Sequence, residues 1–129
     1  MIKILDFTLL LFYCLFIYWL SDQSSLQKPF DFGFDYQDKL YHASAYSIMG
    51  LLAWRNFKHL ISSPIILALL SIAFCSLYGL SDEWHQSFIA GRESDVADWV
   101  ADTSGAIMAV MFLHKLTRVK YYKRLKVQG

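Results

Sequence analysis

Residues 61–80 read ISSPIILALLSIAFCSLYGL and contain no charged side chain. A helix needs about 20 mainly apolar residues to cross the hydrocarbon core of a bilayer, and this run has that length. Pro64 lies near its start, where the first turn of a helix tolerates proline because the missing N–H would have no partner there. The run therefore predicts a membrane-spanning helix.

The composition of the whole chain also indicates a membrane protein. Of its 129 residues, 56% are hydrophobic, 17% aromatic and 18% charged, whereas soluble domains average about 45–50% apolar and about 25% charged residues. A soluble domain of this length has too small an interior to bury so many large apolar side chains. A soluble nucleic-acid-binding or adaptor protein is therefore the least favoured interpretation. Cys14 and Cys75 lie in apolar runs with no metal or redox spacing, and we interpret them as buried apolar residues.

Three other segments predict spanning helices: residues 4–20, 40–54 and 96–114. The first is interrupted by Asp6, is not followed by a signal-peptide cleavage pattern, and is interpreted as a retained span. Residues 40–54 are short and include His42, so hydropathy alone does not establish this span, and the charge distribution decides for it. The sequence thus predicts an all-α integral membrane four-helix bundle, with residues 1–129 as a single domain.

Basic residues are concentrated on one side of this predicted bundle. Four spans place both termini and residues 55–60 together, and most of the 12 basic residues fall there: Lys3, Arg55, Lys58, Lys115, Arg118, Lys120, Lys123, Arg124 and Lys126. The opposite side has Lys28, Lys39 and Arg92. Because basic loops stay in the cytoplasm, this asymmetry predicts a protein of the cytoplasmic (inner) membrane with both termini cytoplasmic. Three spans would put basic clusters on both sides, which argues against that arrangement.

Two smaller features fit the same bundle. The basic tail, residues 115–129, is interpreted as a topology determinant lying against anionic headgroups rather than as an arm that binds nucleic acid. Gly50 and residues 104–106 are small enough to let neighbouring helices approach closely. We therefore expect neighbouring helices to approach each other closely at these residues.

Three stretches that are far apart in sequence meet at the predicted extracytoplasmic face: residues 38–42, 81–86 and 91–102. Their candidate functional side chains are Asp38, Lys39, His42, Asp82, Glu83, His85, Gln86, Arg92, Asp95, Asp98 and Asp102. Carboxylates within a membrane are costly unless they face the bundle interior, pair with a cation or contact water. The natural partners here are Lys39, Arg92 and the two histidines, so we expect one polar cluster.

Helical spacing refines this expectation. Asp38 and His42 are four residues apart and share one side of a helix. Asp95, Asp98 and Asp102 follow an i, i+3, i+7 pattern and predict one acidic stripe. Both sets can therefore face the same interior space.

Several of these residues also have an ordinary structural interpretation: an N-cap for Asp38, an interfacial anchor whose amino group extends to water for Lys39, exposed loop residues for Asp82 and His85, and an ion-pair partner for Arg92. His59 and His114, on the cytoplasmic side, are interpreted as ordinary interface residues. Asp98 and Asp102 are the hardest to explain in this way, because ionisable groups at membrane depth are usually functional.

At these residues the sequence resembles the VanZ-like family, named for a glycopeptide-resistance accessory protein. The family pattern has an Asp-Lys-x-x-His opening, an Asp-Glu-x-x-Gln stretch, an Arg with an Asp six residues on, and a polar residue and Gly in the last span. The matching residues are Asp38, Lys39 and His42; Asp82, Glu83 and Gln86; Arg92 and Asp98; and Asp102 with Gly105. The resemblance covers residues 35–110. It implies an integral membrane protein linked, in the founding member, to resistance to teicoplanin-type antibiotics, without an established mechanism.

Three functions stay open from the sequence. The first is a cell-envelope protein that alters the surroundings of lipid-linked precursors and affects susceptibility to glycopeptide-type antibiotics. The second is a membrane-embedded hydrolase or transferase that acts on a lipid or lipid-linked headgroup. Its catalytic residues would be Asp38, His42, Glu83, His85 and Asp98, and its substrate-binding residues Lys39, Asp82, Gln86, Arg92, Asp95 and Asp102. The third is a non-catalytic ion-pair network or an ion or proton relay.

Partners and cofactors follow from these alternatives. The lipid bilayer is the expected partner, a lipid-linked envelope precursor follows from the first two functions, and transport would favour a homo-oligomer. No nucleic-acid partner is predicted. Histidine beside carboxylates suits a divalent metal, but no recognised ligand spacing such as His-Glu-x-x-His is present, so the cofactor stays unassigned.

Overall fold

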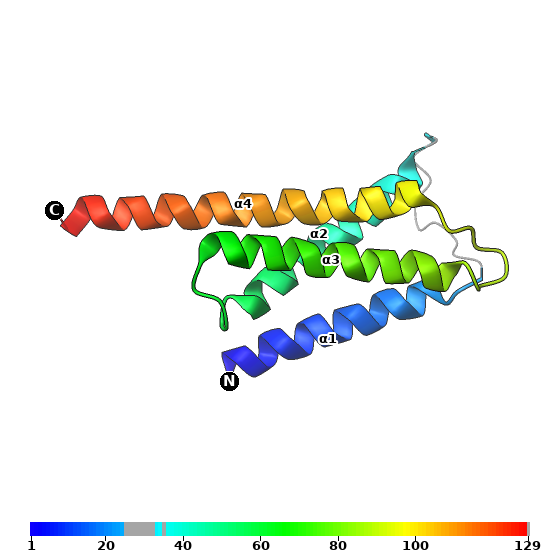
Figure 1. Ribbon diagram of the computed structural model, residues 1–129, viewed down its shortest axis with the longest axis horizontal. Helices are drawn as coiled ribbons and strands as arrows, with labels where there is room; N and C mark the ends of the chain where they lie inside the picture. The colour runs from blue at the N-terminus through cyan, green and yellow to red at the C-terminus, as the bar shows by residue number, and fades with distance from the viewer. Residues whose placement is uncertain (25–32, 35, 129) are drawn as a thin grey trace.

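A computed structural model of the chain contains four helices, α1 (Ile2–Ser21), α2 (Gln37–Phe57), α3 (Pro64–Gln86) and α4 (Val96–Gln128) (Figure 1). The structure describes residues 1–24, 33–34 and 36–128, with side chains described as far as residue 120. No strand occurs among these residues. The predicted all-α fold is confirmed.

The helices extend beyond the apolar runs that predicted them. α2 begins at Gln37, α3 continues to Gln86, and α4 continues through the basic tail to Gln128. Hydropathy marks only the part of a helix that lies in hydrocarbon, whereas backbone N–H and C=O groups stay paired if the helix continues into the interface. Residues 81–86, expected to follow the third span, consequently belong to the last turns of α3.

Local sequence signals explain how the helices begin. Ser63 is the N-cap of α3, and its Oγ accepts a hydrogen bond from the Ile66 N–H at 3.5 Å, with Pro64 in the first turn as expected. The N-cap of α2 is Tyr36, which makes no side-chain capping hydrogen bond. Asp38 lies in the first turn of α2, where a carboxylate favours the positive end of the helix dipole. The interpretation of Asp38 as an N-cap is therefore wrong.

Three helical segments are long and apolar enough to cross a membrane: Ile2–Ser21, Pro64–Gln86 and Val96–Lys120. α2 falls short of this standard, as its polar residues lead one to expect. It packs against each of the other three helices, and most extensively against α4. Its polar side chains can therefore lie against protein rather than lipid, which is how a polar helix is accommodated in a membrane bundle.

Consecutive helices run in opposite directions (Figure 1). The two termini and the α2–α3 connection lie at one end of the bundle, and the starts of α2 and α4 and the end of α3 lie at the other. This is the up-down-up-down connection of a simple four-helix bundle. It places the three polar stretches identified in the sequence at a common end.

The most deeply buried core side chains come from α2, α3 and α4, and α1 adds Leu10 and Ile17. Tyr46 and Met49 of α2, Cys75 of α3 and Ala106 of α4 are each at most 1% exposed. The burial of Cys75 confirms its interpretation as an apolar core residue, and Cys14 is partly buried. Many large apolar side chains of α1 point outward and are exposed, as expected for a surface that contacts lipid.

Candidate functional site

The end of the bundle where α2 and α4 begin and α3 ends gathers most of the predicted polar residues (Figure 1). Lys39 and His42 come from the first two turns of α2, Glu83 from the last turn of α3, and Asp98 and Asp102 from the first two turns of α4. Hydrogen bonds and ion pairs connect α2 to α4 here, so these residues form one polar cluster across three helices.

Lys39 connects α2 to the start of α4. Its Nζ donates hydrogen bonds to Asp95 Oδ2 at 2.6 Å and to Asp98 Oδ1 at 2.5 Å. Because the amino group is held by two carboxylates, the interpretation of Lys39 as an anchor that merely extends to water is wrong. Asp95 lies outside the helices, and the hydrogen bond from Lys39 lowers the pKa of this carboxyl because the ammonium favours its charged form.

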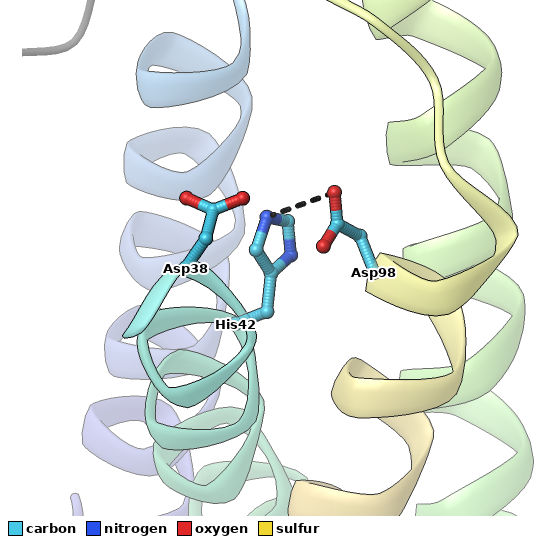
Figure 2. A group of neighbouring side chains, drawn as sticks. All are labelled: Asp38, His42 and Asp98. Carbon is cyan, nitrogen blue, oxygen red and sulfur yellow. Dashed lines mark ion pairs between the residues drawn. The ribbon is translucent and has the colours of Figure 1, made fainter. Parts of the chain in front are cut away.

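His42 lies among carboxylates on both sides of its ring. Its Nδ1 is 2.9 Å from Asp102 Oδ1, and its Nε2 is 3.8 Å from Asp98 Oδ2. Figure 2 shows the ring between Asp98 and Asp38, which precedes it by one helical turn. When Nδ1 carries the proton and donates to Asp102, the lone pair of Nε2 faces Asp98. A carboxylate-oriented imidazole is suited to proton transfer at its other nitrogen.

Asp95 joins α3 to α4 through the backbone. Its Oδ1 accepts a hydrogen bond from the Ala97 N–H at 2.8 Å, which caps the start of α4. Its own N–H donates to Glu83 Oε2 at 2.9 Å. Asp95 precedes the first residue of α4 rather than lying within the helix, but its carboxylate meets that of Asp98 at Lys39. Asp95 and Asp98 therefore lie on one side at the start of α4, as the predicted acidic stripe requires.

A sequence model of the VanZ/LLP1 family matches residues 4–118, which is most of the chain. The chain belongs to the VanZ/LLP1 family. The match contains the whole polar cluster and also α1 from Ile4 onward, so it extends beyond residues 35–110, which carried the resemblance in the sequence. Comparisons with curated proteins and with solved structures each gave no significant match. The predicted family is thereby confirmed.

Asp82 and Gln86 of this VanZ/LLP1 protein are buried in the last turns of α3. Gln86 Nε2 donates to Asp82 Oδ2 at 3.3 Å. The interpretation of Asp82 as an exposed loop residue is therefore wrong.

Arg92 lies in the connection before α4, is partly exposed, and forms no ion pair within the described part of the chain. Its expected role as an ion-pair partner is not observed there.

His85 lies apart from His42, beside α1. Its Nε2 is 3.3 Å from Asp22 Oδ1, and its ring stacks on Tyr18 with a centroid separation of 4.6 Å. An open groove of about 350 Å³ is lined by Tyr18, Tyr78, Ser81, Asp82, Trp84 and His85. The residues assigned to catalysis from the sequence are therefore divided: Asp38, His42, Glu83 and Asp98 lie together, and His85 lies on this groove.

A second polar cluster, at the end of the bundle that contains the termini, was missed by the sequence analysis. Asp6 of α1 is 1% exposed, and its two carboxylate oxygens lie 2.6 Å from Arg55 Nη2 and 2.8 Å from His59 Nε2. His59 is therefore not an ordinary interface residue. The sequence did contain one indication of this cluster: a lone carboxylate inside an apolar run needs a cationic partner in the bundle. Arg55 lies in the last turn of α2, and His59 follows the end of that helix.

His42 is shared by two groups of side chains that could hold a metal ion. One group contains Asp38, His42 and Asp98, and the other His42, Glu83 and Asp102. In each group, one ligand atom from every residue lies within 4.8 Å of the others. No short sequence motif contains either complete group, because Asp98 in one group, and Glu83 and Asp102 in the other, come from helices other than that of His42. Chemically, the cluster combines a proton-transfer group, a held ammonium and oxygen ligands for a cation.

Proposed function

We propose that this VanZ/LLP1 protein acts on the polar headgroup of a lipid or lipid-linked envelope precursor at the extracytoplasmic face of the cytoplasmic membrane. The observation that carries the proposal is the contact between His42 Nδ1 and Asp102 Oδ1 at 2.9 Å, within a cluster at one end of the bundle. A carboxylate fixes the imidazole orientation, and the other ring nitrogen is left to exchange a proton with a reacting group. The reaction class is hydrolysis or group transfer.

The position of the cluster supports a headgroup as substrate. Helices of spanning length place their ends in the headgroup region of the bilayer, and the cluster lies at the ends of α2, α3 and α4. Lys39 and Arg92 supply cationic groups at the same end, and cations with fixed hydrogen-bond donors suit phosphate oxygens. Asp95 and Asp98 hold the Lys39 amino group, so a headgroup phosphate would have to compete with them or bind beside them.

The distribution of basic residues supports the extracytoplasmic orientation. Arg55, Lys58 and the basic residues that follow His114 belong to the end opposite the cluster. Because such residues are retained in the cytoplasm, the termini are assigned to the cytoplasmic side and the His42 cluster to the outer side. At that face, loss of the protein would also change susceptibility to glycopeptide-type antibiotics, and unchanged susceptibility in both deletion and overexpression strains would contradict this part of the proposal.

The test compares lipids and lipid-linked precursors in cells lacking the protein, cells with the wild type, and cells with His42→Ala. We expect one headgroup-modified or lipid-linked species to accumulate in the deletion strain and equally in the His42→Ala strain. His85→Ala is the matched control, since His85 is a histidine at the same end that lies outside the cluster. Its lipids should match the wild type. An unchanged lipid profile in the deletion strain would contradict an enzymatic function.

A non-catalytic function is the second candidate, and the geometry of Lys39 favours it. Its amino group contacts both Asp95 and Asp98, as in an ion-pair network that fastens α2 to α4. The cluster would then hold the bundle together, or relay protons or ions within a homo-oligomer. On this alternative, Lys39→Met would lower the melting temperature and His42→Ala would leave every lipid species unchanged.

A further inference from the structure

Two buried carboxylates beside His42 each have one oxygen without a hydrogen-bond partner among the described residues. They are Oε1 of Glu83, a residue 4% exposed, and Oδ2 of Asp102, a residue 0% exposed. Buried polar atoms are nearly always hydrogen-bonded, and a buried charge is costly unless it is paired. These two oxygens therefore indicate a missing partner that carries positive charge or donates hydrogen bonds.

The neighbouring cations do not supply that partner. The Lys39 amino group is already held by Asp95 and Asp98. His42 contacts Asp102 through its other oxygen, Oδ1. Within the described part of the chain, Glu83 accepts a single hydrogen bond, from a backbone N–H to Oε2. Negative charge from α3 and α4 thus exceeds the positive charge available to it, and a bound cation is the direct way to offset such an excess.

We propose that His42, Glu83 and Asp102 bind one divalent transition-metal ion. One ligand atom from each residue lies within 4.8 Å of the other two. Two ligand atoms that are both about 2.0–2.2 Å from one ion are at most about 4.4 Å apart, so small side-chain shifts bring all three into coordination. An imidazole with two carboxylates suits Zn²⁺ or Mn²⁺ better than Mg²⁺ or Ca²⁺, which prefer oxygen ligands alone.

The second group at His42 is the less suitable one. Asp98 already accepts from Lys39, and Asp38 has another interaction of its own. Glu83 and Asp102 by contrast have free buried oxygens. The ion would therefore lie on the Glu83 side of His42, where it ties α2, α3 and α4 together through one ligand from each helix.

This inference rests on the proposed function and deepens it, because three protein ligands leave coordination positions open for water or a phosphate oxygen. With the ion bound, His42 would serve as a ligand, and an ion-bound water rather than the imidazole would exchange the proton with the headgroup. It is tested by metal binding alone. The full-length protein is purified in detergent without an affinity tag, stripped with a chelator, and titrated with Zn²⁺ or Mn²⁺, followed by elemental analysis and thermal unfolding. We expect about one ion per chain and a rise in melting temperature with the ion. Glu83→Gln and Asp102→Asn, which keep side-chain shape, should each weaken binding roughly tenfold or more.

Asp38→Asn is the matched control, since it removes a carboxylate from the other group at His42, and it should bind the ion as the wild type does. The proposal is overturned by a wild type that binds neither ion, by Glu83→Gln binding as tightly as wild type, or by loss of binding in Asp38→Asn alone. If Glu83→Gln does not fold, Glu83→Asp replaces it, with the same expected weakening and the same overturning result. Metal binding without any lipid change in the deletion strain would overturn the proposed function alone, and a lipid change without metal binding would overturn this inference alone.

Discussion

Gly105 of α4 lies directly against the backbone carbonyl of Ala43 in α2. A β-carbon at position 105 would be 2.0 Å from the Ala43 oxygen and 2.7 Å from its carbonyl carbon. Ser47 reinforces this contact, since its Oγ is within hydrogen-bonding distance of the Ala43 oxygen at 2.8 Å and the Gly105 oxygen at 3.0 Å. The close approach of helices expected from the small residues 104–106 is therefore confirmed, and it sets the distance across which the His42 cluster forms.

Gly105→Ala should destabilise the bundle because the obstacle is backbone, which cannot move without separating α2 from α4. Overpacking of this kind costs about 1–3 kcal/mol. Gly50→Ala should have a smaller effect, since a β-carbon there would be 3.2 Å from the Ala106 oxygen. Thermal unfolding in detergent measures both, with Ser104→Ala at an exposed position of α4 as the control. Equal melting temperatures for Gly105→Ala and Ser104→Ala would contradict this interpretation.

Arg55→Gln should lower the melting temperature, because it leaves the buried carboxylate of Asp6 with His59 as its remaining partner. Removing one member of a buried pair is more damaging than replacing both, since the remaining charge stays buried. The double variant Asp6→Asn with Arg55→Gln should therefore lose less stability than the two single variants combined. Lys3→Gln, an exposed basic residue of α1, serves as the control. Strict additivity would show that the contact between Asp6 and Arg55 carries no coupling.

Asp95→Asn should destabilise the protein at neutral pH and have little effect in acid. The contact with Lys39 lowers the pKa of Asp95 in the folded protein, so folding favours the charged carboxylate. This stabilisation is present above the ordinary pKa of an aspartate and is lost as pH falls below about 4 through the lowered value. Melting temperatures at pH 7 and pH 3 measure the change, and the capping acceptor is retained in Asn. Exposed Glu93→Gln is the control, and an equal deficit at both pH values would contradict the argument.

The proposed orientation predicts which positions a charged, membrane-impermeant maleimide reaches. Ser87→Cys, after α3 at the end that holds the His42 cluster, should react in intact spheroplasts. Ser62→Cys, between α2 and α3, should react only after permeabilisation. The wild type is the blank, since Cys14 and Cys75 lie inside α1 and α3. Reaction of Ser62→Cys alone would reverse the orientation, and reaction of both positions from outside would exclude four spans.

The sequence by itself determined the class of fold and the family. Apolar runs of membrane-spanning length predicted helices because a bilayer requires a minimum length, and the described residues form four helices. Because consecutive spans run in opposite directions, residues 38–42, 81–86 and 91–102 lie at one end of the bundle. This could be predicted from the order of the spans alone. Helix ends were not predictable, because hydropathy changes at the hydrocarbon boundary whereas hydrogen bonding of the backbone continues beyond it.

Only the tertiary structure decided which charges are partners. The sequence does not show that Lys39 contacts both Asp95 and Asp98, or that His85 lies apart from His42. It also does not show that Asp6 contacts Arg55 and His59. Such contacts depend on how α2 is rotated and how closely it approaches its neighbours. That approach is set by packing contacts such as Gly105 against Ala43, which no local pattern encodes. Residue types and the order of the helices therefore determine that polar groups lie at each end of the bundle. Interhelical packing determines which of these groups contact one another.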